Sequence, residues 1–173
     1  MRPSGAREAG LRGRDYGHKA LVAAAVEQLG RRGLGRIRLQ RIADASAQSL
    51  PAFVEEAVEP GSVLHTDGWI SDDRLEKRGY GQRSTFRRGD PTSPADLLPR
   101  VHRVVGLLKR WLLGTHHGAV SVDHLDYYLD EFTFRFNRRT SRHRGKLFYR
   151  LAQQALAVGP APYARLIAHN HKG

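Results

Sequence analysis

Two apolar segments separated by a glycine-rich break constrain the fold of this chain most. In residues 35–45, GRIRLQRIADA, the apolar Ile37 and Leu39 alternate with polar residues, which predicts a half-buried strand. The preceding run in residues 19–30, KALVAAAVEQLG, is rich in alanine and fits either a helix or a strand. Because the glycine-rich segment GRRGLG joins the two runs, we interpret them as an antiparallel hairpin with a loop longer than two residues.

The hydrophobic period changes to that of a helix after the hairpin. In residues 44–62, Ser49 is the predicted N-cap, Pro51 takes the first helical position and Pro60-Gly61 ends the helix. A short strand, a helical turn and a last strand are predicted next, in residues 62–67, 72–80 and 81–90. Three amphipathic helices complete the pattern, in residues 96–114, 121–139 and 145–158. This order predicts an α/β domain in which helices flank a mixed sheet.

The two ends of the chain lack the regular apolar pattern of the segments between them. Residues 1–18 contain arginine and glycine but little apolar content, so we expect an irregular basic arm, and residues 159–173 form a tail. No apolar run reaches the roughly 18 residues of a membrane span. The first residues also lack the apolar core of a signal peptide, and we expect a cytoplasmic protein without a membrane partner. The chain has no cysteine, which excludes disulfides and thiolate metal sites.

The charge of the chain is strongly positive, with 29 Lys and Arg against 17 Asp and Glu. Such an excess is typical of proteins that bind polyanions, usually nucleic acid, although membrane surfaces attract basic proteins too. Seven positive residues and no acid lie between Phe132 and Arg150: Arg135, Arg138, Arg139, Arg142, Arg144, Lys146 and Arg150. Because these charges repel one another and arginine binds phosphate bidentately, we interpret the stretch as a nucleic-acid contact. A solvated face partly neutralised by Asp126, Asp130 and Glu131 is the alternative.

Three residues are candidates for chemistry. Asp67 follows the predicted strand of residues 62–67, where a carboxylate suits Mg²⁺ at a strand end, but Asp-Gly is also a common turn pair. His102 and Lys109 are seven positions apart and share one face of their predicted helix, facing either a site or solvent. The pair His116-His117 follows a predicted helix end and is interpreted as capping or surface. Phosphate-loop, serine-hydrolase and dinucleotide motifs are absent from the sequence.

Several stretches together resemble a known family. LHTDGW, LPRVHRVVGLLKRWLLGTHHGAVSVDHLDYYLDEFTFRFNRR and RGKLFYRL are similar to the catalytic domain of insertion-sequence transposases, most closely the ISXO2-like family of the D-D-E superfamily. The resemblance runs from about Gly10 to Leu156. It implies an RNase-H-like catalytic domain, placed here in residues 19–158. It also implies Mg²⁺ or Mn²⁺ as cofactor, transposon-end and target DNA as partners, a possible homo-oligomer, and DNA strand cleavage and strand transfer.

The resemblance also assigns roles to residues. It implies that Asp67 is the second catalytic carboxylate, that His102 is the third metal ligand, and that Lys109 contacts DNA near the site. The further DNA contacts that we expect are Arg110, Arg135, Arg138, Arg139, Arg142, Arg144 and Lys146.

One departure from the family stands out. The family carries its first catalytic Asp on a strand ahead of the GLRGR region, whereas here no Asp precedes Asp15, which lies beyond that turn. We therefore expect a truncated copy that lacks the first strand and is inactive alone. The alternatives are a non-catalytic basic protein that binds nucleic acid and a remnant reading frame without function.

Overall fold

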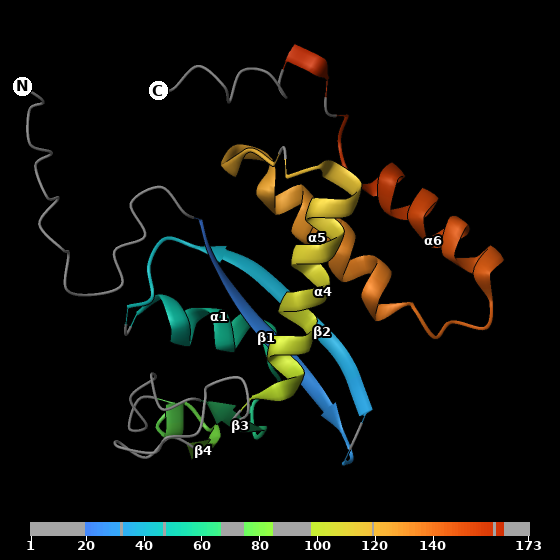
Figure 1. Cartoon of the computed structure of the whole chain (residues 1–173). Coiled ribbons are helices and arrows are strands. Elements are labelled where there is room, and N and C mark those ends of the chain that lie inside the picture. The colour runs from blue at the N-terminus through green and yellow to red at the C-terminus, as the bar shows by residue number, and fades with distance from the viewer. Residues whose placement is uncertain are drawn as a thin grey trace, which may run out of the picture.

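The computed structural model describes residues 20–31, 33–46, 48–66, 75–84, 98–118, 120–160 and 162–164. Its elements in chain order are β1 (Leu21–Leu29), β2 (Gly33–Ile42), α1 (Ser49–Ala57), β3 (Val63–Thr66), β4 (Gly81–Ser84), α4 (Pro99–His116), the 3-10 turn η1 (Val122–His124), α5 (Leu125–Asn137) and α6 (Arg144–Ala157) (Figure 1). The arm predicted in residues 1–18 lies outside the described residues.

β1 and β2 form the predicted antiparallel hairpin. Val26 pairs with Ile37, and the register shifts between Val26 and Gln28. Gly30 turns the chain with a φ of 56°, a backbone conformation that glycine adopts without a steric cost. The alanines of β1 therefore lie in a strand, because pairing with β2 outweighs their weak intrinsic preference for a helix.

The main core lies between one face of this hairpin and two helices. Ile37 and Leu39 of β2 pack against Val104 and Leu108 of α4, and against the α5 residues Leu125, Leu129, Phe132 and Phe136. Ile37 is 1% exposed and Val104 is 0% exposed, so these two side chains are sealed from water at the centre of the layer. Figure 1 shows α4 crossing the hairpin, while α5 runs beside the hairpin. Burial of the apolar stripes of both helices fixes their positions on the sheet.

A second, smaller cluster forms around α1 and the short strands. β3 pairs with β4 in parallel, with Val63 opposite Gly81. Val54 of α1 packs with Leu75 and Tyr80, and the Tyr80 hydroxyl donates to the Val58 carbonyl over 3.0 Å. The α/β class is thus confirmed. The RNase-H-like arrangement stays a prediction, because the strands that the structure describes form two separate two-stranded sheets instead of one mixed sheet.

Two of the differences between the observed and the predicted helix boundaries concern helix caps. Ser49 is the first residue of α1 and not its N-cap, which is Gln48. The Ser49 hydroxyl instead donates to the Asp44 carboxylate over 2.6 Å, a short-range bond that braces the turn before the helix. α4 continues past Gly114 to His116 and ends where His117 adopts a left-handed φ of 51°.

The free edge of β2 is closed by the last turn of α5. The Ile37 backbone N–H donates to Asn137 Oδ1 over 2.7 Å, and Asn137 Nδ2 donates back to the Ile37 carbonyl over 3.0 Å. The Arg139 guanidinium donates to the Leu34 and Gly35 carbonyls of the same edge. Groups that an open edge would leave free to pair with another chain are thereby satisfied.

We predict that Asn137→Ala destabilises the fold by about 1–3 kcal/mol, because both backbone groups of partly buried Ile37 lose their partner. Urea unfolding measures the change. Gln28→Ala is the matched control, since the Gln28 carboxamide is exposed and bonds only the nearby Gly30 carbonyl; its stability should change by less than about 0.5 kcal/mol. Equal stabilities for the two variants would show that the edge contact contributes nothing.

Candidate nucleic-acid interface

Two of the predicted site residues, His102 and Lys109, lie on α4. Both are exposed, as is the adjacent Arg110, whereas Val104 and Leu108 of the same helix are buried against the hairpin. Pro99 lies in the first turn of α4, where its missing N–H costs no hydrogen bond. The core thus holds α4 by one side and leaves these polar residues in solvent.

Asp67 lies outside the described residues, so its distance from His102 is not part of this structure. The strand predicted ahead of it is present as β3, which ends at Thr66. Among the residues that the structure does describe, no group of three or more His, Asp or Glu side chains is arranged to hold a metal ion. The predicted metal pair of Asp67 and His102 includes Asp67 and stays a prediction.

The basic stretch of residues 132–150 separates into residues with and without partners inside the protein. Arg135 forms an ion pair with Glu131 over 2.7 Å, as the acidic residues before the stretch suggested. Arg139 stacks over the Phe136 ring at 4.0 Å while it donates to the edge of β2. Both guanidinium groups are thus engaged within the fold.

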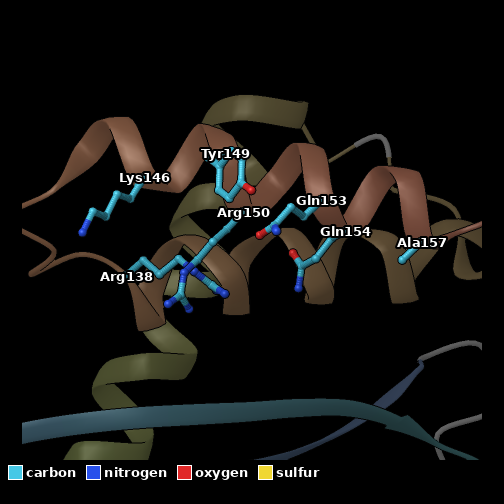
Figure 2. Close-up of a pocket in the computed structure, with 7 residues that line it drawn as sticks. All are labelled: Arg138, Lys146, Tyr149, Arg150, Gln153, Gln154 and Ala157. Atoms are coloured by element: carbon cyan, nitrogen blue, oxygen red, sulfur yellow. The ribbon is translucent and has the colours of Figure 1, made fainter.

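Other positive residues of this stretch line a groove between α5 and α6. The groove has a volume of about 570 Å³ and opens to solvent. Its lining consists of Arg138, Lys146, Tyr149, Arg150, Gln153, Gln154 and Ala157 (Figure 2). Figure 2 shows Arg138, from the end of α5, and Arg150, from α6, extending toward each other. We call this feature the α5–α6 groove.

α6 presents its polar side to this groove and leaves apolar side chains in solvent. Both figures place α6 on the side of α5 away from the hairpin. Phe148 is 77% exposed and Leu156 is 88% exposed, and none of the α6 side chains that the structure describes is buried. The lining of the groove therefore includes Lys146 and Arg150 and none of the leucines of α6.

A second open cleft lies between α1, β2 and α5. Arg41 forms an ion pair with Asp126 over 3.1 Å, and Gln40 donates to Glu56 over 3.1 Å. Asp130 also lines this cleft. Partial burial, together with the charge of Asp126, raises the pKa of the Asp130 carboxyl above its ordinary value.

The histidine pair after α4 has two different roles. His117 is the C-cap of α4, as the sequence suggested. The His116 ring instead packs at 4.9 Å from Trp111 and 4.5 Å from Tyr128, so it belongs to an aromatic cluster joining α4 to α5. The signal in the sequence was the presence of Trp111 and Tyr128 in the apolar stripes of both helices.

The comparisons with known proteins give one match. The family model of the ISXO2-like transposase domain matches residues 2–137 of the chain. No curated protein and no solved structure matches the chain. The match ends at the last residue of α5, so α6 lies beyond it. In the part of the chain that the structure describes, no helix is long and apolar enough to span a membrane.

Partial burial and the nearby charge of Asp126 make the ionised Asp130 carboxylate unfavourable in the folded state, and this raises its pKa. The stability of the fold therefore depends on pH. Between the ordinary pKa of Asp and the raised value, the folded state holds more protons, so stability falls as pH rises. We predict that Asp130→Asn is more stable than the wild type at neutral pH, by at most about 0.5 kcal/mol because the residue is largely exposed.

Urea unfolding at neutral pH and at about pH 3, below the ordinary Asp pKa, tests this, because the gain should vanish at the lower pH. Asp123→Asn, at another exposed Asp, is the control and should show no such gain. A gain for Asp130→Asn that persists at low pH would contradict the electrostatic cause.

Proposed function

Because the chain belongs to the ISXO2-like transposase domain family, we propose that it acts on DNA by metal-dependent strand cleavage and strand transfer. The observation that carries the proposal is the family match over residues 2–137, which includes the hairpin, α4 and α5. The net charge of +12 supports a DNA partner, because it favours contact with phosphates. A cytoplasmic location and a homo-oligomer remain predictions within this proposal.

Two of the residues proposed for catalysis are Asp67 and His102, as ligands of Mg²⁺ or Mn²⁺. A divalent ion of this kind, when bound, activates water or a 3′-hydroxyl for attack on a phosphodiester. Support comes from the end of β3 at Thr66, directly before Asp67, and from the exposed position of His102 on α4.

Lys109 and Arg110 are proposed to hold the DNA phosphates beside these ligands. Both follow His102 by about two helical turns on an element that the core fixes. The first turn of α4 is also tied to the hairpin loop, because the Arg100 guanidinium donates to the Arg31 carbonyl. A fixed helix lets cations approach phosphates with little loss of conformational entropy on binding.

A second candidate function is DNA binding without catalysis. The α5–α6 groove favours it, since the groove has no acidic residue in its lining and lies at and beyond the end of the family match. A cleavage assay separates the two functions.

A chain that is inactive alone, as its departure from the family predicts, gives no nicking of supercoiled plasmid; if the chain is active, nicking requires Mg²⁺ or Mn²⁺, and Asp67→Ala and His102→Ala each lower the rate by more than about 100-fold. That loss exceeds the roughly 10–100-fold effect of residues behind the ligands. His143→Ala, at another exposed histidine, is the control and should keep the wild-type rate.

The alternative outcomes of this assay are also informative. DNA binding without metal-dependent nicking would favour the non-catalytic function. Nicking that survives Asp67→Ala would remove the assigned role of that carboxylate.

Metal binding is tested separately from activity by the histidine ring signals in NMR spectra. We predict that Mn²⁺ broadens the His102 signal before those of the other eight of the nine histidines, because a ligand lies closest to the paramagnetic ion. Asp67→Asn should remove this selectivity, since one histidine alone holds the ion weakly. Uniform broadening of all histidines in the wild type would contradict a site at His102.

A further inference from the structure

The α5–α6 groove gathers positive charge from α6 and from the residue that follows α5, at and beyond the end of the family match. Arg138 follows the last residue of α5, and Lys146 and Arg150 belong to α6, which lies wholly beyond residue 137. None of the lining residues is acidic. Three cations that face one opening raise the free energy of the folded chain unless an anion screens them.

The arrangement of the lining indicates an extended ligand. Along α6 the groove residues recur at Lys146, Arg150, Gln153/Gln154 and Ala157, which is a row of about 16 Å at the rise of an α-helix. Lys and Arg at one end bind phosphate oxygens, and the two amides further along donate to and accept from neutral groups. A row of this length suits a polymer that carries repeated charges better than a single small anion.

The arginines next to the groove in the sequence make contacts elsewhere in the fold. The Arg135 side chain is paired with Glu131, and Arg139 is bound to the edge of β2. Arg138 stacks over the Phe134 ring at 3.8 Å and donates to the Phe134 carbonyl over 3.5 Å, contacts that orient its guanidinium while leaving it in the lining of the groove. Arg138, Lys146 and Arg150 are the cations of the basic stretch that line the groove.

We propose that the α5–α6 groove binds the phosphate backbone of a DNA strand, as a contact additional to the one proposed on α4. The inference rests on the proposed function only for the identity of the polyanion as DNA. Phosphate contacts of this kind hold the duplex in position without reading its sequence. The groove would therefore strengthen binding equally on unrelated DNA sequences.

The test compares two double variants of the full chain that each remove two positive charges. Lys146→Gln with Arg150→Gln alters the groove, and glutamine keeps the helix because its helix propensity is close to that of lysine and arginine. Arg36→Gln with Lys77→Gln is the control, because both side chains are exposed and lie outside the groove. Far-UV circular dichroism confirms that all proteins are folded.

Binding to two short DNA duplexes of unrelated sequence is measured by fluorescence anisotropy over a range of salt concentrations. We expect the groove variant to bind both duplexes more weakly and to reduce the slope of log K against log salt by about 2, roughly one unit for each lost phosphate contact. The control should keep the wild-type slope. The ratio of the wild-type DNA affinity to that of the groove variant should shrink by about tenfold from 50 to 200 mM salt.

Each alternative result decides the question. A groove variant with wild-type affinity and slope overturns the inference, and so does a control that loses as much as the groove variant, because the loss would then reflect net charge. A wild-type chain that binds DNA through the groove but gives no metal-dependent nicking leaves the groove intact and removes only the catalytic proposal. A wild-type chain that binds neither duplex overturns both.

Discussion

One carboxamide connects the two halves of this fold. Asn137 bonds both backbone groups of Ile37 across a separation of 100 residues, which joins the last turn of α5 to the outer edge of β2. A two-stranded hairpin is only marginally stable by itself, so β1 and β2 depend on the helices that cover one face and on the group that closes their edge. The same bond fixes where α5 ends, and therefore where Arg138 and the chain leading into α6 emerge.

The core also gives α4 a buried side and an exposed side. Val104 and Leu108 are buried against the hairpin, and this leaves His102 and Lys109 exposed on the rest of the helix surface. A residue can be both exposed and precisely placed only if its backbone is held elsewhere, and here the hairpin face and the Arg100 contact to the Arg31 carbonyl hold it. The core thus positions the proposed catalytic helix α4, whereas α6 contributes no buried side chain to it.

The local parts of this fold were predictable from the sequence, and the long-range parts were not. Alternation in residues 35–45 and the glycines after residue 29 predicted the hairpin correctly, because strand period and turn chemistry are short-range properties. The same holds for α4, α5 and α6, whose apolar stripes marked them to within a few residues. Nothing local in FNRR indicated that Asn137 and Arg139 bond β2, since that role depends on a strand 100 residues away. For the same reason the sequence could not separate Arg135 and Arg139 from the arginines of the groove. Asp67 was identified by its position after β3 and by the family resemblance, and its geometry lies outside the described residues.

The distribution of positive charge shows how stability and binding compete in this protein. Like charges in the stretch of residues 132–150 repel, and the fold relieves part of that repulsion by pairing Arg135 with Glu131 and by directing Arg139 to backbone carbonyls. Lys146 and Arg150 lie on a helix that buries no described side chain, so keeping them uncompensated costs the core little. Lys146 and Arg150 line the groove together with Arg138, and none of the lining residues is acidic. Placing those cations on an outlying helix, away from the core that positions α4, allows the chain to carry a strong positive field without weakening the layer that holds it together.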